Sequence, residues 1–540
     1  MRISTRAIVG VAAATAAVVT ALPAAPAGAD TAPVAPTPAT VSTDVLPAPQ
    51  IDGVVWSQVV AGNRVYVTGK FGHARPFGSA AGTNQVVRGN ILAYDLTTGA
   101  LVSSWAPSLN AQGMAIAASP DGTRIYVSGD FTAVNGVLHN RIAALDATTG
   151  APIAAFSPKL NARARALAVG SDGTVYAGGS FSTVSGVARQ RLVALAPANG
   201  AVKAFNASAE QEVFALTAPA GSGKVIVGGR FTVLSGVANY GLGAVNATTG
   251  AAVAFPANAI IRNAGVNAAV WSLSNDGGQI YGTGYVFGSG GNLEGSFAAD
   301  STTGALVWVN GCLGDTYAAA PIGPVVYTVG HAHNCSQIGS FPEQSPRAFQ
   351  RASALTRAPG AGAKKNVSGP FVGKAAPEML HWLPTIDIGT VTGQHQGAWH
   401  VTGTSSYVLL GGEFPKIDGV AQQGLARLAV RSLAPNHDGP QGYAPLTPKP
   451  SSPSAGKIAL TWTAAWDRDN QTLTYQLLRG PAAGTATVVS TQTVSSAWWS
   501  RPTLSFTDTV PSGSSQVYRV RVTDPLGNSM TSVTATQTAL

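Results

Sequence analysis

The sequence predicts an all-β protein that consists of one large repeat domain followed by a smaller β-sandwich. A short phrase ending in Phe recurs along the chain, each time after a run of β-branched and aromatic residues. The 540 residues include 63 glycines and 34 prolines but only 11% charged residues, which suits short strands joined by tight turns. Near the C-terminus, apolar residues alternate with other residues over longer stretches, as in half-buried strands.

Residues 1–29 are expected to form a signal peptide. Arg2 and Arg6 supply positive charge, residues 7–22 are apolar, and Ala27-Gly28-Ala29 provides the small-x-small pattern before a cleavage point at Asp30. Residues 30–50 are rich in Pro, Ala and Thr, which indicates an extended spacer. No second apolar run has the length of a membrane span. The sequence therefore predicts a secreted, extracellular protein without a membrane span after signal removal.

Two phrases define the repeat. The first ends a β-like run and places Gly two residues before Phe, as in Gly129-Asp130-Phe131, and a Val-x-Gly step often follows it. It recurs at residues 69–71, 129–131, 179–181, 229–231 and 412–414. The second phrase is exemplified by Ile142–Asp146 followed by Gly150. Its Asp or Asn opens a turn by accepting backbone N–H groups two residues on, and its Gly closes the turn where φ is positive.

Each repeat therefore holds about four short antiparallel strands, and we count about seven repeats between residues 51 and 436. Because one such sheet cannot bury its faces alone, the sheets are expected to stack radially as the blades of a β-propeller. The last repeat lacks the turn and the fourth strand. We expect the segment near residues 45–51 to supply that strand and close the ring, although Pro47 and Pro49 cannot donate to a sheet.

The C-terminal part of the chain follows a different pattern. Residues 437–453 are rich in Pro, Gly and Ser and are expected to form a linker, and residues 454–540 then form a separate domain. The spacing of Trp462, Tyr475 and Tyr518 resembles that of the fibronectin type III family. The resemblance implies an immunoglobulin-like β-sandwich of about 100 residues whose Trp fills the core between the sheets.

The repeat phrases resemble those of the delta-60 repeat propellers of secreted bacterial proteins. The likeness rests on the Gly-Gly-x-Phe phrase, the Val-x-Gly step and residues 141–146, and it covers residues 51–436. Residues 312–315 and 331–335 resemble a variant found in exported actinobacterial propeller proteins. The resemblance implies the propeller fold but no activity, because the family has no agreed one.

The two cysteines of the chain, Cys312 and Cys335, are expected to form a disulfide bond, since exported thiols normally pair. A competing reading follows from His331 and His333, which alternate with Cys335 along a strand end. Side chains at such spacing share a face and could ligate zinc or copper. If Cys335 is oxidised, the two imidazoles alone make a weak metal site.

A long insertion in the sixth repeat, residues 331–383, is the first candidate for a ligand surface. Insertions in repeat arrays tend to map to one binding face. The alternative is a loop without a binding role. The polar and aromatic residues of this insertion include Glu343, Arg351, Lys364, Lys365, Glu378, His381 and Trp382.

The propeller axis is the second candidate for a ligand site. Gln394, His395 and Trp399 lie at the expected start of an innermost strand, together with Gln396 and His400. Arg163 and Arg165 occupy the matching part of the third repeat. A channel mouth with His, Gln and Arg could bind a small anion or a sugar, although ordinary propeller lining gives the same pattern.

Carboxylates supply two further hypotheses. Asp467 and Asp469 lie close together in a sandwich loop and could hold calcium, although a plain turn explains them as well. Asp95, Asp146 and Asp300 recur once per repeat and belong to separate blades. Glycosidases need two carboxyl groups across one cleft, so these three are expected to be structural.

These observations favour a secreted, non-catalytic binding or scaffolding protein, expected to be a monomer. Its partner would be an extracellular glycan or cell-wall polymer, or another extracellular protein. The net charge of +9 is scattered rather than clustered, so nucleic-acid binding is not expected. Two alternatives stay open: a hydrolase acting on polysaccharide, and a quinoprotein-like dehydrogenase. We predict no cofactor, since no nucleotide-binding or zinc-protease motif is present in the sequence.

Overall fold

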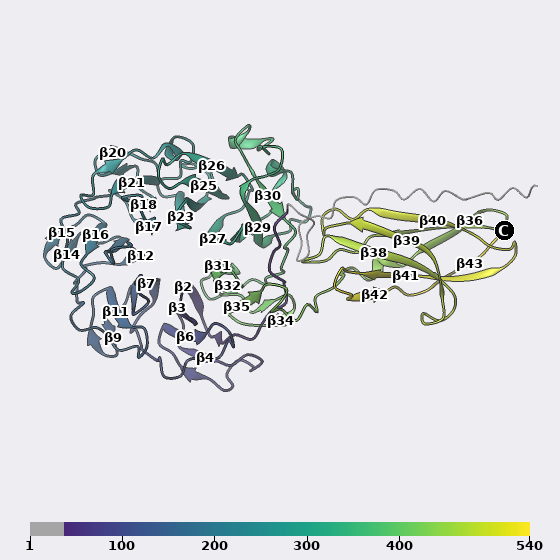
Figure 1. The fold of residues 1–540 in the computed structure, drawn as a ribbon, viewed down its shortest axis with the longest axis horizontal. Coiled ribbons are helices and arrows are strands. Elements are labelled where there is room, and N and C mark those ends of the chain that lie inside the picture. The colour runs from purple at the N-terminus through teal and green to yellow at the C-terminus, as the bar shows by residue number, and fades with distance from the viewer. Residues whose placement is uncertain (1–36) are drawn as a thin grey trace, which may run out of the picture.

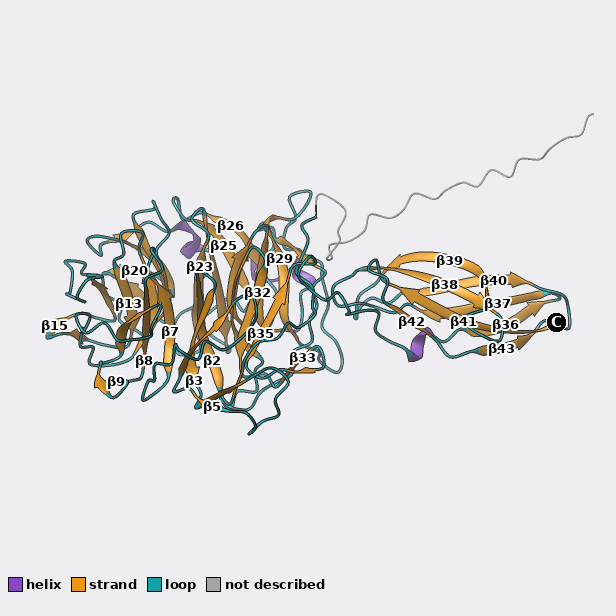
Figure 2. Cartoon of the chain, turned by 60° about the horizontal axis from the view of Figure 1, so that its bottom comes forward, coloured by secondary structure: helices purple, strands orange, loops and turns teal. Residues whose placement is uncertain are grey.

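The computed structural model describes residues 37–540, so the predicted signal peptide and the first residues of the predicted spacer lie outside the described residues. Figures 1 and 2 show a ring of β-sheets with an elongated sandwich projecting from one side. The helical elements in the described part are short 3₁₀ turns: η1 (Pro256–Ala259), η2 (Ser336–Ile338), η3 (Gly369–Phe371) and η4 (Ala444–Leu446). Between residues 37 and 540, no helix has the length and apolar character needed to span a membrane.

The ring is a β-propeller, because each of its sheets runs from an innermost strand at the axis to an outer strand at the rim (Figure 1). Every sheet is antiparallel, as the repeat pattern predicts. From the axis outward, the sheets are β2 (Val54–Ala61), β3 (Arg64–Lys70), β6 (Ile91–Asp95); β7 (Gly113–Ala118), β8 (Arg124–Gly129), β11 (Ile142–Asp146); β12 (Ala164–Val169), β13 (Val175–Gly179), β16 (Leu192–Leu195); β17 (Val213–Thr217), β18 (Lys224–Gly229), β21 (Leu242–Asn246), β22 (Ala252–Val253); β23 (Ala268–Asn275), β24 (Gln279–Val286), β25 (Ser296–Asp300), β26 (Leu306–Asn310); β27 (Thr316–Ile322), β28 (Val325–Ala332), β29 (Gln350–Pro359), β30 (Pro377–Leu380); and β31 (Ala398–Thr404), β32 (Tyr407–Gly412), β35 (Leu425–Ala429).

Small two-stranded hairpins decorate the rim. In the hairpin of β9 (Ala133–Val134) and β10 (Val137–Leu138), Asn135 and Gly136 both have positive φ, +50° and +78°, which is the conformation that a two-residue turn of this type requires. The Val-x-Gly step of the repeat therefore encodes a hairpin. The short rim strands are β1 (Gln50–Ile51), β4 (His73–Arg75), β5 (Val86–Val87), β9 (Ala133–Val134), β10 (Val137–Leu138), β14 (Thr183–Val184), β15 (Val187–Ala188), β19 (Val233–Leu234), β20 (Val237–Ala238), β33 (Lys416–Ile417) and β34 (Val420–Ala421).

The predicted Asp and Asn turns form by side-chain capping. Oδ1 of Asp146 accepts the backbone N–H groups of Thr148 at 3.0 Å and of Thr149 at 2.7 Å. These hydrogen bonds, with that of Thr149 the largest cause, hold the pKa of Asp146 below its usual value. The same contacts recur at Asp95, Asn246 and Asp300. The recurring Asp and Asn side chains of the repeat therefore stabilise turns.

Apolar side chains fill the layers between neighbouring sheets. Trp105, which follows the outer edge of the first sheet, packs edge-on against Tyr66 with ring centroids 5.0 Å apart. Equivalent pairs are Phe156 with Tyr126, Phe205 with Tyr176, and Trp308 with Tyr281. The last layer joins Ile51 and Val55 to Leu409 and Leu425, so the first and last sheets pack together and the ring is closed.

Residues 40–49, here named the closing segment, complete the last sheet. The Ser42 N–H donates to Ala429 O at 2.9 Å and the Leu46 N–H donates to Arg427 O at 2.8 Å, so the segment pairs with β35. The expected closing segment does pair with the last sheet, but through an isolated bridge at Leu46 and a hydrogen bond at Ser42 rather than as a regular strand over residues 45–51. Pro47 interrupts the pairing because it lacks an N–H. Val41 and Ala48 are buried, so the end of the predicted spacer is part of the propeller.

The predicted insertion at residues 331–383 contains the two outer strands of a blade. β29 and β30 lie inside it and complete the sheet of β27 and β28. What remains are two loops, residues 333–349 and 360–376. The repeat phrases do not mark these strands, because a long loop separates β28 from β29 where the other sheets have short connections.

The C-terminal domain is a two-sheet β-sandwich whose core contains Trp462, Tyr475 and Tyr518, as the sequence predicts. It begins earlier than expected, because β36 starts at Lys449 inside the predicted linker. Pro450 and Pro453 are tolerated there because β36 is an edge strand. One sheet contains β36 (Lys449–Ser454), β37 (Lys457–Thr463) and β40 (Thr503–Thr509); the other contains β39 (Thr487–Ser495), β38 (Thr472–Arg479), β41 (Ser515–Thr523), β42 (Ser529–Thr531) and β43 (Ala535–Thr538).

The sandwich contacts the propeller beside β30 and β34 (Figure 1). The Leu383 N–H donates to Arg468 O at 2.8 Å, which joins the segment after β30 to the loop between β37 and β38. Phe341 packs against Trp498 and Trp499 of the sandwich, with ring centroids 5.5 Å from each. Polar and aromatic contacts thus both cross the junction.

Candidate ligand-binding site at the propeller axis

Every innermost strand of the propeller carries a β-bulge near its start. In β31, for example, Ala398 pairs with Gly412 and His400 pairs with Gly411, so Trp399 is the extra residue. A bulge leaves one residue unpaired and re-aims its side chain. The bulged residues line one cavity on the axis, and we name them the axial ring. They are Trp56, Met114, Arg165, Phe214, Trp271, Tyr317 and Trp399.

Most of the axial ring is a continuous aromatic cluster. Trp399 lies at its centre, with ring centroids 4.2 Å from Tyr317, 5.3 Å from Trp56 and 5.8 Å from Trp271. Trp271 continues the cluster to Phe214 at 5.6 Å. Aromatic pairs at such separations attract one another and hold their rings in fixed orientations. The ring therefore forms a rigid apolar wall around the axis.

Arg165 is the charged member of the axial ring. Its guanidinium carbon lies 3.9 Å from the ring centroid of Phe214 and 4.3 Å from that of Trp271. It makes no hydrogen bond or ion pair with any of residues 37–540. Burial lowers its pKa to about 10, opposed in part by the nearby Glu212 carboxylate, so the side chain is still charged at neutral pH. Its N–H groups are available to an anionic group in the cavity.

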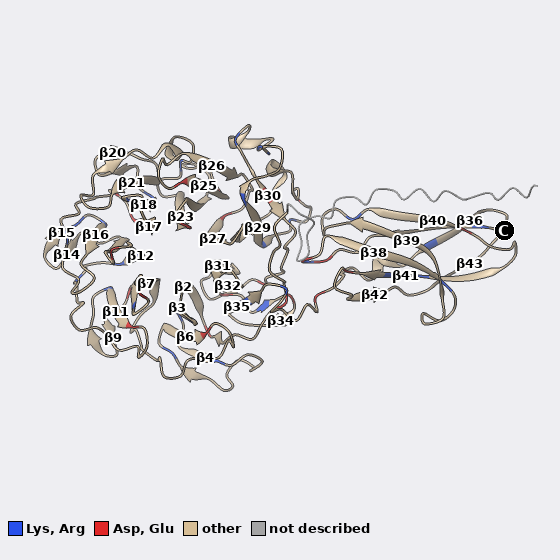
Figure 3. Cartoon of the chain, viewed as in Figure 1, with Lys and Arg blue, Asp and Glu red and all other residues tan. Residues whose placement is uncertain are grey.

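One wall of the channel mouth is basic. Arg163 pairs with Asp130 through two hydrogen bonds of 2.7 and 2.8 Å, and Gln112 donates to the same carboxylate at 2.7 Å. Arg230 donates from Nε to the Tyr285 hydroxyl at 3.0 Å. The carboxylates of Asp130 and Glu212 oppose the guanidiniums of Arg163, Arg165 and Arg230, so three positive charges meet two negative ones and the wall keeps a net positive charge next to the axial ring. Elsewhere on the propeller, charged residues of both signs are spread thinly (Figure 3).

The opposite wall is a hydrogen-bonded network around His331. The Asp315 backbone N–H donates to His331 Nε2 at 3.3 Å, which assigns the imidazole proton to Nδ1. Nδ1 lies 3.0 Å from both Gln396 Oε1 and the Tyr317 hydroxyl. Burial lowers the pKa of His331, so the ring is neutral at neutral pH.

Two carboxylates lie behind this wall. Burial, with a smaller contribution from the Glu294 charge, raises the pKa of Asp315 to about 7, and its Oδ2 has no hydrogen-bond partner among the described residues. Glu413 accepts Thr392 N–H and Oγ1–H at 2.8 and 2.6 Å, and the Trp399 indole N–H at 3.2 Å. Both side chains are buried, with 3% and 2% exposure respectively. Glu413 therefore holds the Trp399 indole and the loop before β31 in place.

The cavity bounded by the axial ring has a volume of about 140 Å³. Complete small-molecule sites are typically about 300–1,000 Å³. The cavity therefore accommodates one small group, and a larger ligand would extend from it into the mouth.

The structure brings together some of the sequence-predicted residues and separates others. Arg165 and Trp399 meet in the axial ring, and Arg163 and His331 lie at its mouth. Gln394 and His395 are exposed in the loop before β31. His333 and Glu343 form a pair, with 2.5 Å between Nδ1 and Oε2, next to Phe349, which also contacts His331.

His381 and Trp382, predicted to face a ligand, are buried instead. Trp382 packs edge-on against Tyr327 with centroids 5.0 Å apart, and His381 Nε2 lies 2.8 Å from Asp467 O across the domain junction. Both residues follow β30, which the sequence did not reveal, and this strand directs them into the core and the junction.

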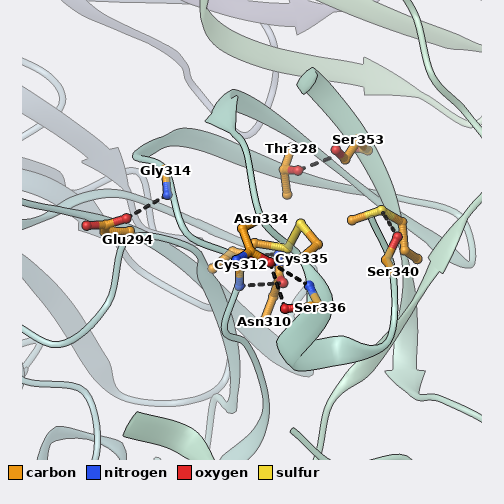
Figure 4. The surroundings of a disulfide bond; sticks show 12 residues. Glu294, Asn310, Cys312, Gly314, Thr328, Asn334, Cys335, Ser336, Ser340 and Ser353 are labelled. Carbon is orange, nitrogen blue, oxygen red and sulfur yellow. Dashed lines mark hydrogen bonds between the residues drawn. A yellow bond between two sulfur atoms is a disulfide. The ribbon is translucent and has the colours of Figure 1, made fainter. Parts of the chain in front are cut away.

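The predicted disulfide bond between Cys312 and Cys335 is present (Figure 4). It ties the segment before β27 to the segment after β28, and Asn334 and Ser336 hydrogen-bond beside it. Cys335 is therefore not a metal ligand. Within residues 37–540, the cluster of three potential metal ligands is Asp438, Asp467 and Asp469, and it does not include His331 or His333.

Sequence reasoning missed most of the axial ring: Trp56, Met114, Phe214, Trp271 and Tyr317. A signal was present, because each of these residues occupies the same place in its repeat, just before or within the first β run. The bulge itself is set by pairing with the second strand, and the alternation of a single strand does not reveal it.

No family model matches the chain, and no curated protein matches it. Among solved structures, the WD40 repeats of RRP9 match with 10% identity and a TM-score of 0.44, covering 72% of this chain and 98% of that one. The structure of U3-55K matches with 10% identity and a TM-score of 0.43, covering 72% and 99%. The computationally designed Ika8 protein matches with 11% identity and a TM-score of 0.39, covering 72% and 100%. These similarities are weak, and the propeller assignment rests on the sheets described above.

Proposed function

We propose that this protein is a secreted, non-catalytic binding protein whose axial ring receives an acidic group of an extracellular or cell-wall glycan. The observation that carries the proposal is the Arg165 guanidinium, which lies over aromatic faces inside a cavity and has no protein anion bound to it. Its charge and planar donors suit a carboxylate. The surrounding Trp and Tyr rings provide the apolar and aromatic lining common to small-molecule sites.

We further propose the finer architecture that the sequence indicates. The propeller would have seven blades of the delta-60 type, and the sandwich would be a fibronectin type III-like domain. The sandwich would then act as a spacer that holds the propeller away from the surface to which the protein attaches. This arrangement is supported by the repeat phrases and by the position of Trp462 in the sandwich core.

The hydrolase alternative is less well supported. A glycosidase needs two carboxyl groups that flank the scissile bond in an open cleft. Asp315 and Glu413 are the carboxylates behind the His331 wall, and both are buried. Glu413 is already occupied by the Thr392 and Trp399 donors. This geometry favours binding over bond cleavage.

The test is a glycan-binding measurement on the purified protein, first on an array of acidic and neutral glycans and then by calorimetry. Arg165→Gln should weaken binding of an acidic glycan at least about tenfold, because it removes a charge-assisted contact of about 1.5–3 kcal/mol. Arg189→Gln, on the rim of the same blade, is the matched control and should bind normally. Equal binding by the Arg165 variant would place the ligand elsewhere, and failure to bind any glycan would favour a protein partner.

A further inference from the structure

Three carboxylates converge where the closing segment, the linker and the sandwich meet. Asp438 comes from the linker, and Asp467 and Asp469 come from the loop between β37 and β38. One carboxylate oxygen of each lies within 4.8 Å of the other two. Thr43 of the closing segment donates its backbone N–H to Asp469 Oδ2 at 2.8 Å, which brings a third stretch of chain to the same point.

The three carboxylates are buried, and the positive charge beside them is too small to balance their negative charge. Asp467 and Asp469 are 0% and 1% exposed. Arg468 is the basic side chain that pairs with the group within residues 37–540, and it contacts Asp438 at 2.6 Å while also contacting Asp418 at 3.0 Å. Arg468 therefore pairs with Asp418 and Asp438, and Asp467 and Asp469 have no ion pair within residues 37–540. Removing unpaired charges from water is costly unless a counter-ion accompanies them.

An orphaned oxygen points to the missing partner. Asp467 Oδ1 accepts the backbone N–H groups of Asp469 at 3.0 Å and Asn470 at 3.1 Å. Its other oxygen, Oδ2, is buried and has no hydrogen-bond partner among residues 37–540. A buried polar atom without a donor requires a proton, a water molecule or a cation.

The Thr43 hydroxyl cannot satisfy its two acceptors. Its Oγ1 lies 2.8 Å from Asp438 Oδ2 and 3.2 Å from Asp469 Oδ2. A hydroxyl has one proton, so one of these contacts joins oxygens with no hydrogen between them. Both observations show an excess of acceptors over donors.

The spacing and the burial of the oxygens together favour one kind of cation. Calcium binds oxygen at about 2.3–2.6 Å, so ligands on opposite sides of the ion lie about 4.6–5.2 Å apart. Magnesium requires about 2.0–2.1 Å and hence about 4.0–4.2 Å between opposite ligands. Because all three oxygens lie within 4.8 Å of one another, one Ca²⁺ ion can reach each of them, and a buried set of protein oxygens suits calcium better than magnesium, which usually keeps several waters.

We propose that Asp438, Asp467 and Asp469 bind one Ca²⁺ ion that locks the sandwich and the closing segment onto the propeller. The Thr43 hydroxyl lies close enough to take part, and water completes the coordination shell. The sequence suggested Asp467 and Asp469 as candidates, and the structure adds Asp438 from the linker. The site is structural and distant from the axial ring, so it stands independently of the proposed glycan binding.

The experiment uses the full secreted chain, stripped of divalent ions with EGTA and then dialysed. Calorimetric titration with CaCl₂ should show one site, with MgCl₂ binding at least about tenfold more weakly. Thermal unfolding in 1 mM CaCl₂ should occur about 5 °C higher than in EGTA, because ligand binding to the folded state raises its stability. Tb³⁺ luminescence excited through tryptophan provides a second readout, since Trp466 precedes Asp467.

Asp467→Asn should abolish the calcium response, and Asp438→Asn is the second variant should the first fail to fold. Asp146→Asn is the matched control, because Asn246 occupies the same turn position in another repeat, and it should keep the full response. The proposal is overturned if the wild type releases no heat with CaCl₂ and unfolds at the same temperature in CaCl₂ and EGTA. Greater stability of Asp467→Asn than wild type in EGTA, together with a wild type that itself shows no calcium response, would instead indicate shared protons and would also overturn it.

Discussion

Aspartates of this protein differ in behaviour because their surroundings differ. Hydrogen bonds from Thr149 hold the pKa of Asp146 low in an exposed turn. Burial raises the pKa of Asp315 to about 7 at the channel mouth, and burial together with the neighbouring Asp469 charge raises that of Asp467 to about 8. The exposed Asp recurs in the repeats and is structural, whereas the buried ones mark the two candidate sites.

His400 should make the protein less stable in mild acid. Burial in the channel lowers its pKa to about 4, whereas an unfolded histidine titrates near pH 6.5. The unfolded chain therefore binds the proton first, so stability is complete above pH 6.5 and falls as the pH drops toward 4. At pH 5 we expect this group to cost about 1–2 kcal/mol of unfolding free energy.

The measurement is urea unfolding at pH 7.5 and pH 5.0. His400→Gln should lose less stability between the two pH values than the wild type does. His395→Asn, at an exposed position of the preceding loop, should behave like the wild type. An unchanged pH dependence in the His400 variant would mean that this imidazole titrates normally in the folded protein.

At the scale of strands and turns, the sequence determines the local chemistry well. The Asp-x-Thr-Thr-Gly turns, the buried Phe of each Gly-x-Phe phrase and the alternation around Trp462 all appear as expected, because each depends on residues close in the chain. The bulge positions depend on pairing between strands. The prolines of β36 argued against a strand in the sequence, although an edge strand tolerates them. The proximity of Asp438 to Asp467 depends on the docking of the two domains, which no local pattern predicts.

The disulfide bond should stabilise the sixth blade through its loop. It closes a loop of 23 residues, and the chain-entropy relation assigns about 3 kcal/mol to a loop of this length. We expect the double variant Cys312→Ala, Cys335→Ala to unfold at a lower urea concentration and to leave the binding that we propose at the axis unchanged. Wild-type protein under reducing conditions is the control and should show the same loss. An unchanged midpoint in both would show that the fold does not need this bond.

At the scale of the whole molecule, ring closure depends on the closing segment. Residues 42–46 complete the sheet of β35, and Arg427 donates to Pro47 O at 3.1 Å and to Thr97 O at 2.7 Å in the first blade. The last and first blades are thus joined by apolar packing, by the closing segment and by one arginine.

A chain that begins at Gln50 should be destabilised by about 4 kcal/mol, from the loss of two strand hydrogen bonds and the burial of Val41 and Ala48. Differential scanning calorimetry would record a lower melting temperature. Pro47→Ala is the control, because the Pro47 side chain is exposed and its carbonyl oxygen is retained, and it should melt like the wild type. Equal melting temperatures for the shortened and full chains would show that apolar packing alone closes the ring.

On each innermost strand, the bulge makes the pairing of the backbone independent of the side chain that faces the axis. The backbone around a bulge pairs with the second strand, while its side chain lines the axial cavity. Substitutions at Met114 or Phe214 would therefore leave the layers between the sheets intact. A lineage of such proteins could acquire new ligands by exchanging one side chain per blade, and an engineer could do the same by varying the axial ring alone.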